Sequence, residues 1–234
     1  MEPAVTTTAY FLKLWAWIEA NVKRVAVGAG IATVVILLIS FYLWQQSQTE
    51  IAAGQALTEL VISITPDSST SQLADAYLKI AADFPGTRAG ELAAVQGAAA
   101  LFESGKYAEA QAQFKKYIGT HPGGIFCAQA ELGVAASLDA QGKTDLAASA
   151  YQRVIGGFSD LNTVSAAKFS LAQIDELQGK LVDAENLYED IARSNPGGSL
   201  GSESALRAMG LKAKLPSAPT STTPLSSFNL NTKP

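Results

Sequence analysis

Residues 105–122, GKYAEAQAQFKKYIGTHP, return in degenerate form at 142–159 (GKTDLAASAYQRVIGGFS) and at 179–196 (GKLVDAENLYEDIARSNP). In each copy a Gly-Lys pair precedes an alanine, and an aromatic side chain follows that alanine four residues later. The copies begin 37 residues apart. Self-similarity at this period is typical of stacked helical units and predicts an α-solenoid. One period earlier stand the residues of a predicted degenerate fourth copy: Leu73, Tyr77, Ile80 and Pro85.

Each unit is predicted to form a helix, a tight turn and a second helix. Gly105 supplies the backbone freedom for the turn, and Pro122 ends the second helix because proline cannot continue it. The apolar stripes of the two helices are Ala93, Ala94, Gly97, Ala98 and Leu101, then Ala108, Ala110, Phe114, Tyr117 and Ile118. Small residues are expected where the paired helices cross, so that their axes can approach to about 8–10 Å. These are Ala98, Ala135 and Ala172 on the first helices, and Ala110, Ala147 and Ala184 on the second. The aromatic residues Phe114, Tyr151 and Tyr188 are expected to fill the gap to the next repeat.

These residues resemble the tetratricopeptide-repeat family over about residues 51–213. The resemblance rests on the small residue before Leu101 and Leu138, the Gly-Lys turn, the small-xxx-aromatic run and the terminal proline. The period departs from the family's length of about 34 residues, and a longer loop at 159–163 is expected to absorb the difference. The family's early Trp is absent, its place taken by Ala94, Glu131 and Lys168. The resemblance implies a tetratricopeptide-like α-solenoid of about four helix pairs; together with a predicted N-terminal single-pass transmembrane helix, the predicted fold class is all-α.

A membrane anchor is predicted at residues 25–44, which contain no charged side chain. At about 1.5 Å per residue, this length spans a hydrocarbon core of roughly 30 Å. Lys13, Lys23 and Arg24 precede the span, and no Lys or Arg follows it before Lys79. The positive-inside rule therefore predicts a cytoplasmic N-terminus and a periplasmic repeat domain in a bacterial inner membrane. Within the span, Gly28 and Ala32 form a small-xxx-small pair that would admit a second membrane helix. The alternative is that small residues are simply frequent in membrane spans.

A cleaved signal peptide is the competing interpretation of this segment. Its apolar core would usually be 7–15 residues long and followed by small residues for the peptidase. The apolar run here is longer and leads into 41–46, FYLWQQ, which is a poor cleavage site. The sequence therefore favours an uncleaved anchor. The predicted organisation is a cytoplasmic amphipathic segment (1–24), the transmembrane helix (25–44), the repeat domain (45–214) and a Pro/Ser/Thr-rich disordered tail (215–234), with 203–214 as a terminal capping helix.

Composition excludes several functions. A net charge of −4 opposes nucleic-acid binding, which needs a basic face. The single cysteine, Cys127, rules out an internal disulfide and a cysteine-pair metal site, and it is expected to pack as a small hydrophobe at a helix start. The only histidine, His121, is expected to be a solvated loop residue without positioned partners. Acidic residues are expected to lie at helix ends or on outer faces as ordinary solvated groups, among them Asp139, Asp175, Glu176 and Asp183. No enzyme, cofactor, metal or small-molecule substrate is predicted.

A binding role remains, and the family resemblance implies that the first helices line a concave groove. Its predicted lining is Leu92, Val95, Ala99 and Phe102, then Gln129, Leu132, Ala136 and Asp139, then Ala166, Phe169, Gln173 and Glu176. Val95, Leu132 and Phe169 stand where some relatives clamp a peptide carboxylate with Lys and Asn. The groove better suits a segment held by apolar burial. The alternative is that these side chains pack only against neighbouring helices.

The whole layout resembles the YfgM-type ancillary subunits of the bacterial SecYEG translocon. The matching parts are 15–24, the span ending in Tyr42-Leu43-Trp44, and a helix predicted from Ile51 to Ile64. This resemblance implies an interaction scaffold whose partners are translocon subunits, periplasmic chaperones or unfolded client segments. An envelope-assembly or cell-division adaptor similar to the Tol-Pal-associated and BamD-like tetratricopeptide proteins is the alternative. An envelope enzyme with substrate-recruiting repeats is disfavoured because no catalytic constellation accompanies the repeats.

Overall fold

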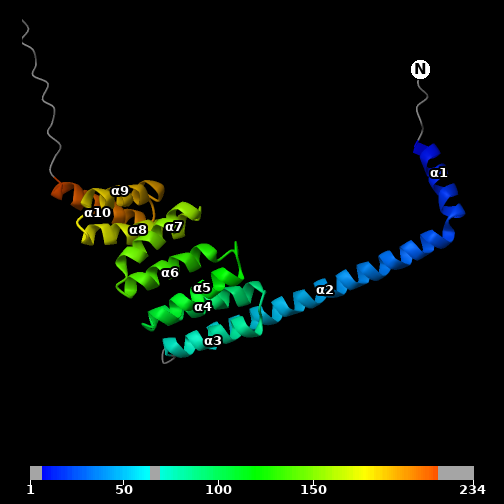
Figure 1. The fold of residues 1–234 in the computed structure, drawn as a ribbon, viewed down its shortest axis with the longest axis horizontal. Helices are drawn as coiled ribbons and strands as arrows, with labels where there is room; N and C mark the ends of the chain where they lie inside the picture. The colour runs from blue at the N-terminus through cyan, green and yellow to red at the C-terminus, as the bar shows by residue number, and fades with distance from the viewer. Residues whose placement is uncertain (1–6, 64–68, 216–234) are drawn as a thin grey trace, which may run out of the picture.

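A computed structural model describes residues 7–63 and 69–215 of the chain. Within these ranges the chain is all-α, with ten helices and no strand, and the repeats form a tetratricopeptide-like solenoid (Figure 1). In chain order the helices are α1 (Thr7–Ala20), α2 (Val22–Ser63), α3 (Thr70–Asp83), α4 (Arg88–Glu103), α5 (Tyr107–Thr120), α6 (Cys127–Ala140), α7 (Thr144–Gly157), α8 (Leu161–Leu177), α9 (Leu181–Ser194) and α10 (Ser199–Lys214). The predicted disordered tail (215–234) lies outside the described residues except for Leu215, which is the C-cap of α10.

The same turn joins the two helices of each repeat. Gly105, Gly142 and Gly179 have φ values of 79°, 73° and 75°, a region that only glycine enters without strain. In each turn the glycine N–H and the following lysine N–H donate to carbonyls of the preceding helix at 2.8–3.1 Å, which is the Schellman arrangement. The predicted Gly-Lys turn is confirmed. It also fixes one side chain near the end of each first helix in an equivalent position, namely Phe102, Asp139 and Glu176.

Alanines lie at the closest crossing of each helix pair, as predicted. Ala98, Ala135 and Ala172 on the first helices and Ala110, Ala147 and Ala184 on the second are all 0% exposed. Ala108, however, was predicted on the apolar stripe of α5 and is exposed. It lies two residues before Ala110, where the buried stripe begins, and therefore faces the outer side of the helix.

Replacing Ala147 with leucine is expected to destabilise the repeat domain by about 1–3 kcal/mol, because three added carbons must fit where helices α6 and α7 already touch. Thermal unfolding of the full chain in detergent, followed by circular dichroism, measures the loss. The matched control is Ala108→Leu, which adds the same atoms to an exposed position of a neighbouring helix. Equal unfolding temperatures for the two variants would contradict the assigned crossing.

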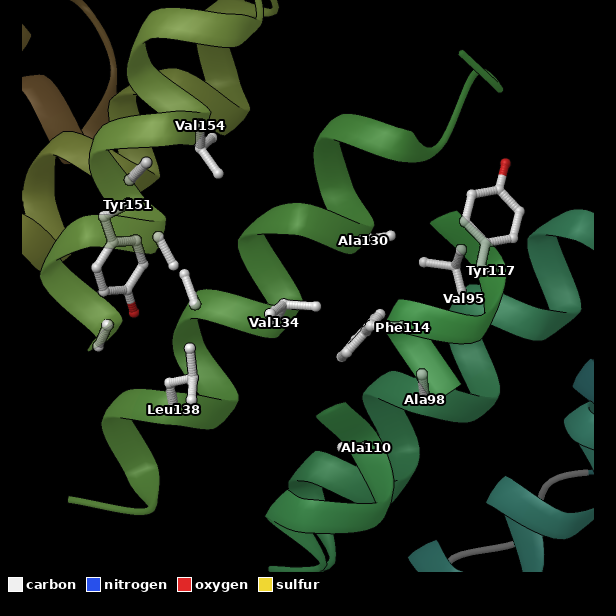
Figure 2. Close-up of a cluster of buried hydrophobic side chains, with 14 of the residues drawn as sticks. Val95, Ala98, Ala110, Phe114, Tyr117, Ala130, Val134, Leu138, Tyr151 and Val154 are labelled. Carbon is white, nitrogen blue, oxygen red and sulfur yellow. The ribbon is translucent and has the colours of Figure 1, made fainter. Parts of the chain in front are cut away.

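A second contact recurs between successive repeats at an offset of 19 residues. A side chain from a second helix meets a small residue on the next first helix, and Phe114, for example, packs directly on the backbone of Gly133. A Cβ atom built on Gly133 would lie 2.4 Å from the Phe114 ring, and one on Gly97 would lie 2.8 Å from Leu78. The equivalent pairs are Leu78–Gly97, Phe114–Gly133 and Tyr151–Ser170, and at the fourth pair, Tyr188–Arg207, an arginine replaces the small residue. Figure 2 shows Phe114 pointing from α5 toward α6 among the buried side chains of this core.

The degenerate first copy is present but shifted by one residue. The 37-residue period aligns Leu73 with Ala110, but Ala74 is the fully buried residue of α3 and Leu73 is half-buried. The partner of Gly97 is Leu78 and not Tyr77. Helix α3 nevertheless ends before Pro85, as predicted, so only the buried positions within the helix differ from the prediction. The expected long loop at 159–163 is also shorter, because α8 begins at Leu161 with Asp160 as its N-cap.

The predicted border between the anchor and the repeat domain falls inside a single helix. A short turn at Asn21 separates α1 from α2, and α2 runs without interruption through the apolar stretch to Ser63 (Figure 1). It is the one helix in the described part that is long and apolar enough to cross a membrane, with a mean hydropathy of 2.4 in its most apolar window. The predicted separate helix starting at Ile51 is therefore the end of α2, and Ile64 lies outside the described residues.

Helix α2 contacts the solenoid through a side chain, Glu50, that caps the start of α4. The Glu50 carboxylate accepts hydrogen bonds from the backbone N–H groups of Arg88 (3.0 Å) and Ala89 (3.3 Å), the first residues of α4. A carboxylate at a helix N-terminus satisfies unpaired donors and opposes the positive end of the helix dipole. Ala53, one turn further on, is completely buried. Because Glu50 follows the end of the candidate span at Trp44 by six residues, the solenoid begins about 9 Å beyond that end.

Helix α10 closes the array as a first helix without a second one. The prediction placed a capping helix at 203–214, and α10 begins slightly earlier, at Ser199. Met209 lies 37 residues after Ala172, the residue at which α8 meets its paired helix. Since no second helix covers α10 within the described residues, Met209 is 67% exposed.

Candidate partner-binding groove

Most of the predicted groove residues lie together on the first helices of successive repeats. The first of two cavities on this face has a volume of about 220 Å³ and lies between α4 and α6. Its lining is largely apolar: Val95, Ala99, Phe102, Phe114, Leu132, Gly133 and Ala136, with Glu103 and Gln129 as its polar members. Six of these positions were predicted from the repeat register, and Phe114, Gly133 and Glu103 were not.

The apolar cavity is built by the repeat contacts already described. Phe114 lies against Gly133 and forms one wall, and Val95, only 1% exposed, forms the floor. The Phe102 ring packs against Tyr107 of the following helix at a centroid distance of 5.1 Å, which fixes its orientation. Leu132 is half-buried and leaves part of its surface open to a ligand. A cavity of this size and lining suits one apolar side chain.

The second cavity continues the same face toward the end of the array. Its volume is about 540 Å³, and it is lined by Asp139, Thr144, Gln173, Ile174, Glu176, Leu177 and Arg207. Asp139 and Glu176 occupy the position that Phe102 holds in the preceding repeat. The groove therefore changes from apolar to acidic along the array while its backbone geometry repeats.

Arg207 also lines the second cavity and was not predicted, although the repeat pattern includes its position. It takes the place of Gly97, Gly133 and Ser170 in the contact series. The guanidinium lies over Phe169 (5.1 Å) and Tyr188 (5.8 Å), and its Nη2 atom is 3.1 Å from a Glu203 carboxylate oxygen. Its Nη1 atom is 3.8 Å from Glu176. An offset of 19 residues from Tyr188 would have identified Arg207.

The carboxylates of this region differ in their environments. Desolvation raises the pKa of Asp139, which forms no ion pair within the residues the structure describes. Glu176 accepts a hydrogen bond from the Tyr188 hydroxyl at 3.3 Å. The expectation of ordinary solvation is therefore wrong for Asp139 and Glu176, and also for Asp175, which is 8% exposed and lies 3.6 Å from the Lys180 ammonium group. For Asp175 it fails because this residue faces the turn that brings Lys180 back over it. Asp183 is exposed, as expected.

Other predicted site residues lie outside the two cavities. Leu92 and Ala166 are half-buried one turn earlier on α4 and α8, and Phe169 packs edge-on against Tyr188 at 5.4 Å instead of lining a cavity. Gly28 and Ala32 are exposed on α2, and nothing lies within 4 Å of a Cβ built on Gly28. Their pairing with another membrane helix stays a prediction.

A polar cluster lies outside the two cavities around Tyr117, whose hydroxyl donates to Glu91 at 2.8 Å. Burial and this hydrogen bond raise the pKa of the Tyr117 phenol well above its ordinary value. His121 is half-buried and stacks on Tyr117 with centroids 4.8 Å apart, which corrects its assignment as a solvated loop residue. Cys127 is buried at the start of α6, as expected, with its thiol on the His121 carbonyl. Across residues 7–63 and 69–215 no group of three His, Cys, Asp or Glu side chains could hold a metal ion.

Comparison with known families agrees with this architecture. Residues 15–123 match the family described as tetratricopeptide repeat-like domain. The match begins before the candidate membrane span and ends just after α5, so it covers slightly less than half of the chain. A search among curated proteins found no match. Together with the solenoid, the family match supports a tetratricopeptide-repeat protein. Repeats of this class are non-catalytic modules of protein–protein interaction.

Proposed function

We propose that this chain is a membrane-anchored interaction scaffold that holds segments of other proteins in the groove lined by α4, α6 and α8. The observation that carries the proposal is the apolar cavity of about 220 Å³ between α4 and α6, which leaves Phe102 and Leu132 partly open to solvent. Covering such a surface with a partner side chain gains roughly 25 cal/mol per Å² of apolar area.

The proposed location is the periplasmic side of a bacterial inner membrane. The support is the apolar stretch of α2, preceded by Lys13, Lys23 and Arg24 and followed by no basic residue before Lys79. The layout resembles YfgM-type translocon subunits, so the proposed partners are translocon subunits, periplasmic chaperones or client segments. The alternative is an envelope-assembly or cell-division adaptor of the Tol-Pal-associated or BamD-like type, whose members carry a cleaved signal or a lipid anchor.

Photocrosslinking from probes at Ala32 and Phe102, followed by mass spectrometry, tests the proposal. Translocon subunits captured at Ala32, with chaperones or clients captured at Phe102, would support the Sec-associated role. Capture of division or outer-envelope proteins would favour the adaptor. A probe at exposed Ala108, which lies outside the groove, is the control. Identical partners from Phe102 and Ala108 would contradict use of the groove.

The orientation is tested separately. Reversing the charges of Lys23 and Arg24 to glutamate is expected to invert or mix the topology, because it reduces the cytoplasmic-side positive charge next to the span to Lys13 alone. A reporter whose activity requires a periplasmic position, fused after Pro234, measures this. The same reversal at Lys115 and Lys116 on α5 is the control and should leave the reporter periplasmic. A reporter that stays in the cytoplasm with the unaltered chain would refute the orientation.

A further inference from the structure

The charges around the groove are unequal. Glu103 lines the apolar cavity, and Asp139 and Glu176 line the second cavity, where Arg207 is the only basic lining residue. Arg207 is already engaged, because it lies near carboxylates of Glu203 and Glu176 and rests on two aromatic rings. Asp139 has no such partner among the described residues. The second half of the groove therefore has uncompensated negative charge.

We propose that the groove binds an extended protein segment in which an apolar side chain is followed or preceded, two to four residues away, by a lysine or arginine. The apolar side chain enters the cavity between α4 and α6 beside Leu132 and Phe114. The basic side chain enters the second cavity and pairs with Asp139 and Glu176. This inference rests on the proposed function and specifies the chemistry of the partner.

The spacing follows from the helix that joins the two cavities. Leu132 and Asp139 both lie on α6, seven residues apart, which corresponds to about 10 Å along the helix axis. An extended chain advances about 3.3 Å per residue, so it covers this distance in about three residues. The length of a Lys or Arg side chain accommodates one residue more or less. Exposed Leu177, on the edge of the second cavity, offers apolar surface to the methylene stem of that side chain.

The environment of Asp139, which is half-buried without a counter-charge among the described residues, suits a site that binds a cation. Burial without a counter-charge raises the pKa of its carboxyl group, so ionised Asp139 weakens the free protein. A bound ammonium or guanidinium group would supply the missing charge. Asp139→Asn is therefore expected to leave the unfolding temperature at pH 7 unchanged or higher while it weakens binding. A residue that served only to stabilise the fold would not combine these two effects.

The experiment uses the full chain in phosphatidylcholine nanodiscs, whose uncharged surface does not attract basic peptides. Its probes are fluorescent nine-residue Ser/Gly peptides with one Phe and with Lys, Gln or Glu placed two, three or four residues to either side. Fluorescence anisotropy should show Lys peptides binding at least fivefold more tightly than Gln peptides, with Glu peptides weakest. The double variant Asp139→Asn, Glu176→Gln should remove the Lys advantage. The matched control Asp145→Asn, Asp183→Asn removes two exposed carboxylates outside the groove and should preserve it.

Each outcome separates this inference from the proposed function. If Leu132→Ser weakens all Phe peptides while Lys and Glu peptides bind equally, the groove binds segments and the charge preference is refuted. If Leu132→Ser has no effect on peptides that do bind, the groove itself is refuted as the site. Absence of binding by every peptide would overturn the inference. If the groove and control double variants lose the Lys advantage equally, the preference for Lys reflects net charge alone. This result would also overturn the inference.

Discussion

Replacing Phe114 with alanine is expected to lower the free energy of unfolding by about 3–5 kcal/mol, the usual cost of removing a buried aromatic ring. Phe114 is 4% exposed, and its ring rests on Gly133, whose missing side chain leaves the space that the ring fills. The cavity left by alanine would lie between two repeats, where the backbone cannot collapse without moving α6 against α5. Chemical and thermal denaturation of the full chain in detergent, followed by circular dichroism, measures the loss.

The matched control is Phe114→Leu, which copies the Leu78–Gly97 contact of the preceding repeat. It is expected to cost only about 1–1.5 kcal/mol, because leucine still covers most of Gly133. In a solenoid each repeat contacts mainly its neighbours, so the alanine variant should also separate unfolding of the first repeats from that of the last. A single transition with equal losses for both variants would contradict the role given to this contact.

The repeat could be derived from the sequence because its physical causes are local. A glycine that must adopt positive φ, an alanine at a close crossing and an aromatic four residues later each leave a mark at a fixed spacing. Ala98, Ala135 and Ala172 were accordingly placed correctly, as were Gly105, Gly142 and Gly179. The same spacing placed most of the cavity-lining side chains on one face.

The errors have separate causes. Leu73 was aligned with Ala110 because the period was extended rigidly, whereas the contact of Leu78 with Gly97 shifts the alignment of α3 by one residue. Glu50 of α2 caps a helix that begins 38 residues later, a contact that the sequence pattern does not mark. Asp175 is 8% exposed and lies 3.6 Å from Lys180, five residues later in the Gly-Lys turn. The Glu50 contact has no fixed spacing in the sequence, whereas the Leu78–Gly97 contact and the Asp175–Lys180 turn follow the repeat and could have been derived from it.

The gradient along the groove follows from one repeated position. The Schellman turn holds Phe102, Asp139 and Glu176 at equivalent places, so the side chain alone decides the chemistry of each segment. The apolar end belongs to the repeats nearest α2 and the acidic end to those farthest from it. A partner held in both cavities would thus place its apolar side chain on the repeats nearer α2 and its basic side chain on the repeats farther from it.

High pH is expected to unfold the repeat domain through three buried tyrosines. Burial is the main cause that raises the pKa of Tyr117, Tyr151 and Tyr188 above the ordinary value of about 10. The folded state therefore keeps these protons when the unfolded chain has lost them. Their stabilisation is complete below pH 10 and is lost as the pH rises. Each group that ionises only on unfolding removes about 1.4 kcal/mol per pH unit, so three remove about 4 kcal/mol per unit, a large part of a usual 5–15 kcal/mol.

Unfolding temperatures between pH 8 and pH 12 measure this loss, and Tyr117→Phe identifies its source. At pH 8 the variant should be less stable by about 1–3 kcal/mol, because Glu91 loses the hydroxyl donor at 2.8 Å. Above pH 10 the stability of the variant should fall about one third less steeply with pH, because phenylalanine has no proton to lose. The stability curves of the variant and the unaltered chain should therefore meet about one to two pH units above pH 10. Parallel curves for the two proteins would mean that Tyr117 ionises as readily in the folded chain as in the unfolded one, which its burial against Glu91 forbids.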